Sequence, residues 1–328
     1  MLNLTMTDGY LFHDKKGRPV QRAVPLAPLA DTHTHLTQFD GEVFSAPLAL
    51  ARAQAAGVRF MVVPVDPTDD AQEPLTLMSQ LSFWQSRSEK LTQDLKAEGV
   101  QILDFGAGEP ACQLPGDMHI LVGVHPYGAE QVGDEVFSKM ELLLSDSHAI
   151  GVGEIGLDYN CDVNPEVQKR SFREQLALAR EKDLPVELHI RDAKGDEAVK
   201  AHADAYEILK KDGGSPAGMV LHCFTQGPSV MEPFSDMGCC IAFGGACTFK
   251  NAPEIRQAAA LCPEHLLLVE TDAPYMAPHP LRGQVAESAM VVLNAAKLAE
   301  VRSQAGVNPP QRTYELLWNN AMRLFGKA

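Results

Sequence analysis

The chain has 328 residues, of which 45% are hydrophobic and 22% are charged, a length that suits one large α/β barrel or two ordinary domains. Its formal net charge of −15 argues against a broad electropositive surface that binds nucleic acid by counterion release, although a small basic patch remains compatible with it. No apolar run approaches the roughly 20 residues that cross a bilayer, and the first twenty residues lack the apolar segment of a secretory signal, so the sequence predicts a cytoplasmic protein without a membrane anchor.

The first 27 residues are predicted to form an extension ahead of the main domain. Within it, residues 8–25 have the pattern of a hairpin whose turn lies around Asp14 and Gly17. Residues 28–328 are predicted to form one domain, because no low-complexity linker divides them.

Eight short apolar runs follow, and each is succeeded by a stretch with helical spacing. This alternation is typical of repeated β/α units, and eight units over about 250 residues close a TIM-type (β/α)8 barrel. The predicted strands are 29–36, 58–65, 119–125, 149–155, 185–190, 218–224, 239–245 and 265–272. The predicted helices are 45–56, 70–98, 129–145, 165–182, 195–211, 228–236, 252–260, 284–303 and 311–325.

Two of the predicted helices carry more detail. The helix over 165–182 has Asn164 as a candidate N-cap and a proline at its first position. The stretch 66–118 is long for one connection, so it is interpreted as an insertion that contains a long amphipathic helix. Its Phe83-Trp84 pair could contact the core, or it could form a lid or a partner surface.

The first predicted strand ends in a pair of histidines, His33 and His35. Alternate residues of an extended strand share a face, so the two imidazoles are expected to point the same way and to be able to bind one metal ion. A lone His-x-His pair is a weak signal, and further ligands are needed to support a metal site.

Four more residues that can bind metal each lie at the carboxyl end of a different predicted strand: Glu154, His189, His222 and Asp272. In a parallel barrel these ends converge on one face, where the active sites of such barrels lie. A buried carboxylate without a partner is strongly penalised, so one shared site explains these residues better than separate core contacts do.

The segments that contain these residues resemble the TatD-related metal-dependent deoxyribonucleases of the amidohydrolase-like superfamily. The resemblance runs from about residue 28 to the end of the chain, and its motifs are specific in combination. They are DTHTHL (31–36), VGVHPY (122–127), GEIGLDY (153–159), LPVELHIRDA (184–193), LHCFTQG (221–227), FGGACTFKNAPEIR (243–256) and LLVETDAPYMAPHPLRG (267–283).

The resemblance implies a catalytic site with two divalent metal ions, whose identity among zinc, magnesium, manganese, iron and nickel is left open. The implied ligands are His33, His35 and Asp272 at one ion, His189 and His222 at the other, and Glu154 bridging the two. Asp272 is the candidate general base, and Glu154 is the second catalytic carboxylate.

Contacts to substrate are predicted for four further residues: His125, Arg191, Arg282 and Tyr159. Each has an alternative interpretation. His125 could be a packed histidine at a strand end, and Tyr159 could be structural instead of stacking on a base or ribose. Arg191 could point to the opposite face and pair with Asp192 or Glu187.

The resemblance implies a deoxyribonuclease that cleaves DNA phosphodiester bonds, as a 3′-5′ exonuclease, through water activated by two metal ions. No obligate protein partner is evident.

The alternative is an ester or amide hydrolase, such as an aminoacyl-tRNA deacylase or a small-metabolite hydrolase. The acidic surface and the QVAES sequence after Gly283 favour it, because the family usually carries a lysine there. A metal-stabilised binding protein without turnover is a third possibility. The coordination of the ion distinguishes it, because protein ligands enclose a structural ion, whereas catalysis needs an open coordination position.

Overall fold

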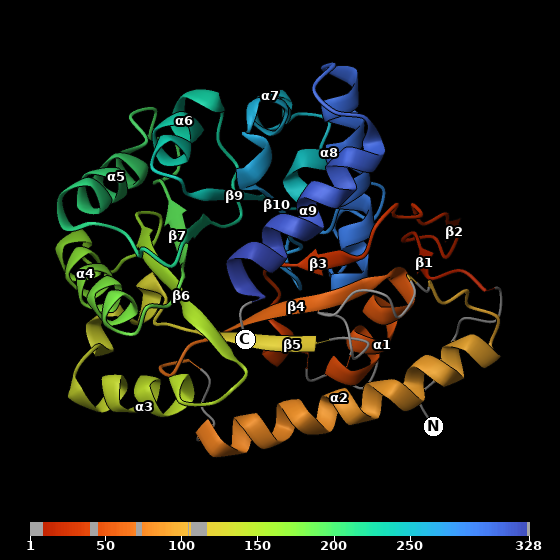
Figure 1. The fold of residues 1–328 in the computed structure, drawn as a ribbon, viewed down its shortest axis with the longest axis horizontal. Coiled ribbons are helices and arrows are strands. Elements are labelled where there is room, and N and C mark those ends of the chain that lie inside the picture. The colour runs from red at the N-terminus through yellow and green to blue at the C-terminus, as the bar shows by residue number, and fades with distance from the viewer. Residues whose placement is uncertain (1–8, 40–44, 70–73, 104, 106–116, 327–328) are drawn as a thin grey trace.

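The fold is built from eight strands and the helices between them (Figure 1). The structure is a computed structural model, and it describes residues 9–39, 45–69, 74–103, 105 and 117–326. The strands form one parallel sheet in the order β10-β9-β8-β7-β6-β5-β4-β3. They are β3 (Leu29–Asp31), β4 (Val58–Val65), β5 (Asp117–Val122), β6 (Ala149–Asp158), β7 (Val186–Arg191), β8 (Met219–Leu221), β9 (Cys240–Phe243) and β10 (Leu267–Val269). The helices are α1 (Ala46–Ala56), α2 (Pro74–Ala97), α3 (Asp134–Leu144), α4 (Pro165–Glu181), α5 (Lys200–Asp212), α6 (Pro228–Asp236), α7 (Pro253–Leu261), α8 (Val291–Gln304) and α9 (Pro310–Phe325).

The two ends of this sheet meet through the residues at and after β3 and β10. Thr32 N donates a hydrogen bond to Val269 O at 3.3 Å, and Asp272 N donates to His33 O at 3.0 Å. These contacts close the sheet and confirm the predicted eight-stranded β/α barrel.

Five strands end earlier than the sequence predicts: β3, β5, β8, β9 and β10. β3, β8 and β10 stop before the candidate site residues, so His33, His222 and Asp272 follow their strands instead of lying in them. Cys223 and Asp272 have φ angles of 45° and 60°, through which a strand does not continue. His33 and His35 therefore do not share a face of one extended strand, and that part of the expectation was wrong. Their side chains nevertheless lie together, as expected.

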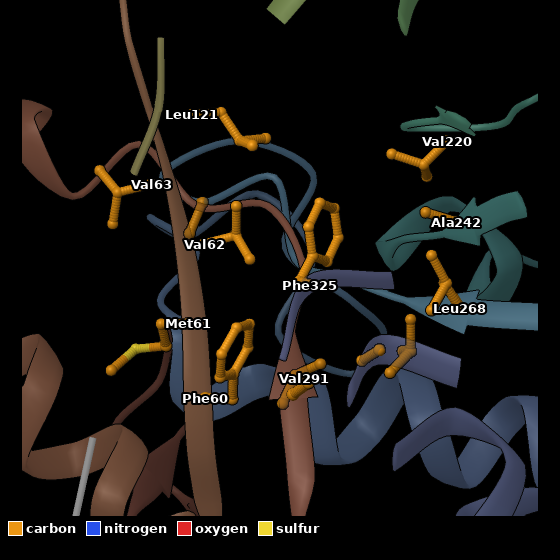
Figure 2. Packing of buried hydrophobic residues seen from close by; sticks show 14 of the residues in the cluster. Phe60, Met61, Val62, Val63, Leu121, Val220, Ala242, Leu268, Val291 and Phe325 are labelled. Carbon is orange, nitrogen blue, oxygen red and sulfur yellow. The ribbon is translucent and has the colours of Figure 1, made fainter. Parts of the chain in front are cut away.

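Side chains from the strands form the centre of one hydrophobic cluster that extends to the surrounding helices. Phe60, Leu121, Val220 and Leu268 belong to it, together with Phe325 from the last helix (Figure 2). Strands of a parallel sheet are buried on both faces, which is why they are near-continuous apolar runs in the sequence. This packing leaves the carboxyl ends of the strands as the natural position for polar groups.

The predicted hairpin is present in the segment that precedes the first barrel strand. β1 (Phe12–His13) and β2 (Pro19–Val20) pair antiparallel, and the Asp14 carboxylate accepts hydrogen bonds from Lys16 N and Arg18 N in the turn. The hairpin is tied to the barrel because the Gln284 side chain donates to His13 O.

The long helix α2 fills much of the predicted insertion, of which residues 70–73, 104 and 106–116 lie outside the described part. It packs against α1 (Figure 1). The two aromatic residues differ, because Trp84 is buried whereas Phe83 is 64% exposed. The core interpretation is therefore correct for Trp84 and wrong for Phe83.

Several helices differ from prediction at their first residues. α3, α5 and α8 begin later than expected. Before α3 the chain forms the 3-10 helix η2 (Pro126–Gln131), and Gly133, with extended backbone, separates the two helices. α4 begins as predicted, with the Asn164 side chain accepting a hydrogen bond from Glu166 N.

Among the described helices, none has the length and apolar content needed to cross a membrane.

Candidate metal centre

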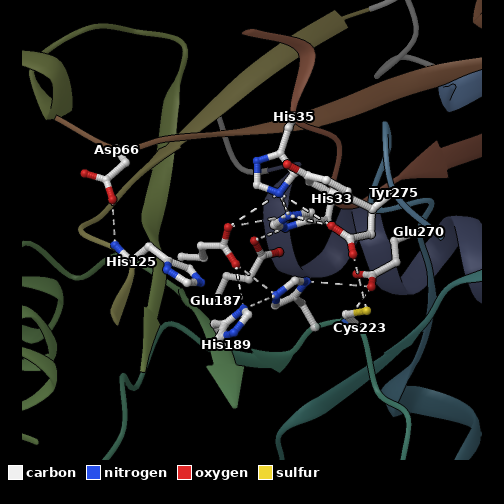
Figure 3. A network of polar contacts seen from close by, with 12 residues as sticks. His33, His35, Asp66, His125, Glu187, His189, Cys223, Glu270 and Tyr275 are labelled. Carbon is white, nitrogen blue, oxygen red and sulfur yellow. Dashed lines mark hydrogen bonds and ion pairs between the residues drawn. The ribbon is translucent and has the colours of Figure 1, made fainter. Parts of the chain in front are cut away.

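The six predicted ligand side chains lie together at the carboxyl ends of the strands (Figure 3). They come from five places around the barrel, which are widely separated in the sequence. His33 and His35 follow β3, Glu154 lies in β6, His189 lies in β7, His222 follows β8 and Asp272 follows β10. The barrel therefore produces the convergence that the strand-end argument predicts.

The first group of ligand atoms surrounds the two histidines after β3. His33 Nε2 and His35 Nε2 are 3.1 Å apart. Glu154 Oε1 lies 3.9 Å from His33 Nε2 and 3.6 Å from His35 Nε2. Asp272 Oδ1 lies 3.7 Å from His33 Nε2 and 3.4 Å from His35 Nε2. Two nitrogens and two oxygens thus face one small space, and we call them the first group.

The second group lies on the other side of the same glutamate. Glu154 Oε2 is 3.0 Å from His189 Nδ1 and 3.0 Å from His222 Nε2. The two nitrogens are 3.2 Å from each other. The two carboxylate oxygens of Glu154 therefore face separate groups, which is the arrangement of a bridging ligand.

The charges in this cluster explain why it suits cations. Burial raises the pKa of Glu154, but His222 and His189 lower it to well below its ordinary value. Burial lowers the pKa of His222, but Glu154 and Glu270 raise it well above that of a free imidazole. The raised pKa of His222 favours its protonation, which balances the charge of the buried carboxylates. A divalent cation competes for the same lone pairs and carries more charge, so the donor set fits such ions.

Hydrogen bonds hold Asp272 in an unusual backbone conformation beside the first group. Its φ of 60° is left-handed, which is uncommon for a residue other than glycine. Its N–H donates to His33 O, and its own carbonyl accepts from Tyr275 N at 2.8 Å. The preceding Thr271 donates through Oγ1 to Asp31 Oδ2 at 2.6 Å. Backbone strain held in this way by surrounding contacts is concentrated at functional sites.

Both groups open into a cavity of 790 Å³. Five of the six predicted ligands line it: His35, Glu154, His189, His222 and Asp272. An ion held at these atoms would be accessible to a substrate, whereas a purely structural ion is enclosed by protein ligands. The cavity therefore favours a catalytic centre over a structural metal site.

Comparison with known proteins identifies the family to which this barrel and its donor set correspond. The sequence model of the TatD related DNase family matches residues 30–326, which is nearly the whole chain. The chain belongs to the TatD related DNase family. It is a metal-dependent hydrolase of this family, since relatives that it covers over 92% and 98% of their own length carry that description.

Three relatives illustrate the match to the TatD family. Bacillus subtilis YabD, described as an uncharacterized metal-dependent hydrolase, is 33% identical over 72% of this chain and 92% of its own. The 3′-5′ ssDNA/RNA exonuclease TatD of Pantoea vagans is 35% identical over 51% of this chain and 62% of its own. The crystal structure of the TatD homologue YJJV from Escherichia coli superposes with a TM-score of 0.72 at 27% identity, covering 92% of this chain and 100% of its own.

Two of the four predicted substrate contacts lie in the cavity of this TatD protein. His125 and Arg191 both line it. Burial, followed by the charge of His189, lowers the pKa of His125 to about 3, so its imidazole is neutral. Arg191 pairs with neither of the carboxylates expected as alternatives. Its guanidinium instead lies 3.9 Å from Asp158 Oδ2.

The other two predicted contacts are engaged elsewhere. The Tyr159 hydroxyl donates to Asp204 Oδ2 at 2.6 Å, and the Arg282 guanidinium lies 4.2 Å from the centre of the Phe249 ring. Neither residue is among those that line the cavity in the described part of the chain. This geometry favours structural roles for both.

Two tyrosines that the sequence did not single out do line the cavity. Tyr127 and Tyr275 are 56% and 52% exposed, and their rings contact His125 and His35 edge to face. Tyr275 also donates to Gln38 Oε1 at 2.8 Å. Tyr127 lies two residues after His125 and Tyr275 three residues after Asp272, so their places near predicted site residues were the available signal.

Carboxylates that the sequence also did not single out as site residues lie behind three of the histidines. Glu187 Oε1 is 2.6 Å from His33 Nδ1, Asp158 Oδ2 is 3.2 Å from His189 Nε2, and Glu270 Oε1 is 3.7 Å from His222 Nδ1. All three carboxylates are fully buried. Carboxylates in such positions orient metal-binding histidines and increase their basicity. For Glu187 and Glu270 the available signal was an acidic residue within a mainly apolar predicted strand, whereas Asp158 lies beyond the predicted strand 149–155.

His125, Asp158 and His189 also lie close enough together to resemble a third metal-binding group. Asp158 Oδ1 already accepts from Asn160 N, and Oδ2 faces both His189 and the Arg191 guanidinium. A neighbouring guanidinium opposes a further cation, so we interpret this group as support for His189 and not as an ion site.

Proposed function

We propose that this TatD family hydrolase is a 3′-5′ exonuclease that cleaves single-stranded DNA with two divalent metal ions. The first group would hold one ion and the second group the other, with Glu154 as the shared ligand. The observation that carries the proposal is that the two oxygens of Glu154 face two separate sets of ligand atoms on an open cavity. The exonuclease named TatD among the relatives supports the choice of substrate.

The charges of the cavity fit this assignment. Its lining includes the carboxylates of Asp66, Asp69, Glu154 and Asp272, and Arg191 is the only arginine or lysine among the described lining residues. A phosphodiester would be repelled by these carboxylates alone. Two divalent ions would change the electrostatic potential in the cavity from negative to positive. We therefore expect binding of DNA, and not only its cleavage, to require metal.

Bound ions would supply Lewis acidity, which activates water and neutralises charge that develops on the phosphodiester. Asp272 would accept the proton of the attacking water. Burial raises the pKa of Asp272, but hydrogen bonding to His35 and the charge of His33 lower it below its ordinary value, so the carboxylate is ionised. Arg191 would bind a phosphate oxygen, and the neutral His125 would donate or accept a hydrogen bond beside it.

The size of the cavity favours a chain end. A volume of 790 Å³ lies within the range of small-molecule pockets, roughly 300–1,000 Å³, and is not that of a groove for duplex DNA. The exposed rings of Tyr127 and Tyr275 could stack on unpaired bases, because stacking needs no particular base sequence. A single-stranded terminus therefore fits better than an internal duplex site.

The test is degradation of a single-stranded oligonucleotide labelled at its 5′ end, with Mg²⁺ or Mn²⁺. We expect stepwise shortening from the 3′ end, loss of cleavage with chelator, and recovery when metal is returned. An oligonucleotide blocked at its 3′ end by phosphorothioate linkages is the control and should resist degradation. Absence of chelator-sensitive cleavage by protein shown to contain metal would contradict the proposal.

Arg191 provides a second test. Because it would be the main protein cation on the phosphate, Arg191→Ala is expected to raise KM about tenfold, the value of one charge-assisted hydrogen bond. The slope of log affinity against log salt should become less steep by about 0.7, the contribution of one phosphate contact in single strands. Arg312→Ala is the matched control, because Arg312 is similarly exposed but pairs with Glu264 away from the cavity. Equal effects of the two variants would exclude a phosphate contact at Arg191.

The same acidic lining supports a second candidate, an ester or amide hydrolase whose substrate carries no phosphate at the reacting bond. One arginine against four lining carboxylates suits a neutral or cationic substrate better than a polyanion. A panel of carboxylic esters, aminoacyl esters and phosphodiesters would separate the two. A kcat/KM for esters more than about 100-fold above that for DNA would favour the second candidate.

A further inference from the structure

Among the three buried carboxylates behind the histidines, Glu187 makes the shortest contact with the cluster. Glu187 is 0% exposed, and its Oε1 lies 2.6 Å from His33 Nδ1. Oε2 is buried and has no hydrogen-bond partner. In Figure 3 the carboxylate lies among the side chains of the cluster, and Glu187 is not among the described residues that line the cavity. Glu187 is therefore not placed to touch a substrate.

The barrel accommodates this side chain at a cost to stability. A buried carboxylate with an unpartnered oxygen is unfavourable, and an apolar residue of similar volume at such a position is often neutral or stabilising. Both neighbours in the strand, Val186 and Leu188, are buried apolar residues. Gly153 on β6 provides the space, because a Cβ at this residue would lie 2.7 Å from the Cβ of Glu187. Packing alone does not account for a glutamate here.

The contact with His33 fixes which nitrogen faces the ligands. An ionised Glu187 carboxylate can only accept, so His33 Nδ1–H donates to Oε1, and Nε2 then carries the lone pair that faces Glu154 and Asp272. The reverse tautomer would place a proton on Nε2, between His33 and the other ligand atoms. Only the first tautomer can bind a metal ion at Nε2.

We propose that Glu187 is a positioning residue that holds His33 in its metal-binding tautomer and strengthens the first group for a divalent ion. This inference rests on the metal assignment of the proposed function but not on the identity of the substrate. The effect should be confined to the first group, because Glu187 contacts His33 and, among the described residues, forms no hydrogen bond or ion pair with His189 or His222.

Two substitutions separate the hydrogen bond from the charge. Glu187→Gln keeps an oxygen that can accept from His33 Nδ1, whereas Glu187→Leu removes both the acceptor and the charge. Binding of Zn²⁺ and of Mn²⁺ to chelator-stripped protein would be followed by equilibrium dialysis with elemental analysis, and the thermal unfolding of the stripped protein would be measured in parallel.

We expect wild type to bind two ions. Glu187→Leu should weaken one of them by about 10- to 100-fold, the usual effect of removing such a partner, and leave the other unchanged. Glu187→Gln should lie between Glu187→Leu and wild type. The stripped Glu187→Leu protein should unfold at about the same temperature as wild type, because removal of the unpartnered Oε2 opposes the loss of the acceptor for His33 Nδ1.

Glu287→Gln is the matched control. Glu287 is equally buried, but its carboxylate is bound by the Arg52 guanidinium at 2.6 Å and contacts none of the candidate ligands. Its substitution should lower the unfolding temperature and leave both metal affinities unchanged, which is the opposite pattern.

Three outcomes would overturn the inference. Two unchanged metal affinities in Glu187→Leu would exclude a positioning role while leaving the two-ion assignment intact. A lower unfolding temperature of stripped Glu187→Leu, with both affinities reduced alike, would show that Glu187 supports the fold. A wild-type protein that takes up no divalent ion would overturn the metal assignment and this inference together.

Discussion

Substitution of Glu154 by glutamine is expected to empty both ligand groups at once. One oxygen of this carboxylate faces His33 and His35, and the other faces His189 and His222. The glutamine side chain keeps the shape of glutamate. Its amide oxygen is a weaker metal ligand than a carboxylate oxygen, and its NH2 group is a hydrogen-bond donor that cannot bind a cation. Loss of metal removes several kcal/mol of transition-state stabilisation, and 1.4 kcal/mol is a factor of ten, so kcat/KM should fall about 10³-fold or more.

The measurement for Glu154→Gln combines metal content by elemental analysis with turnover on the same sample. Metal should fall from two ions per chain to less than one, while the circular dichroism spectrum remains that of wild type. Glu141→Gln, at an exposed position on α3, is the control and should change neither quantity. A Glu154→Gln protein that retains two ions and turns over at a rate near that of wild type would show that Glu154 is not the shared ligand.

Substitution of Asp272 by asparagine is expected to separate catalysis from metal content. The shortest contacts of the Asp272 carboxylate with predicted ligands are to His33 and His35 of the first group, at 3.7 and 3.4 Å, so the ion of the second group should remain. As the proposed proton acceptor, Asp272 should contribute about 10²- to 10⁴-fold to kcat, and most of this should be lost. Asparagine tolerates the left-handed backbone of this position nearly as well as aspartate, so the fold should be preserved.

A matched control exists for this backbone conformation. Asp183, after α4, also has a positive φ, of 51°, but lies on the surface away from the cavity. Asp183→Asn should leave both kcat and metal content unchanged. Loss of both ions in Asp272→Asn, or a kcat within about threefold of wild type, would contradict the role given to Asp272.

The fold could be predicted because its signal is repeated. Each apolar run is short and is followed by a helical stretch, and the eight strands fall within or beside the predicted runs. The convergence of Glu154, His189 and His222 needed only their places at the carboxyl ends of strands and the geometry of a closed parallel barrel. Neither inference required side-chain detail.

The surroundings of the ligands could not be predicted to the same extent. Tyr159 and Tyr127 both follow strands by a few residues, yet only Tyr127 lines the cavity, because hydrogen bonding to Asp204 holds Tyr159 elsewhere. Glu187 lies in a mainly apolar strand, two residues before His189, so the sequence predicts that the two side chains share a face of that strand. It does not predict that Glu187 contacts His33. Such contacts join distant segments, and they depend on strand register and loop conformation.

The central claim is that six side chains at one rim of the barrel hold two divalent ions. The most direct measurement is anomalous diffraction from crystals of the protein grown with Mn²⁺ or Zn²⁺. We predict two peaks, both within about 2.3 Å of Glu154 oxygens, one also near His33 and His35 and the other near His189 and His222. Peaks elsewhere, or none at these atoms in crystals that contain metal, would contradict the account.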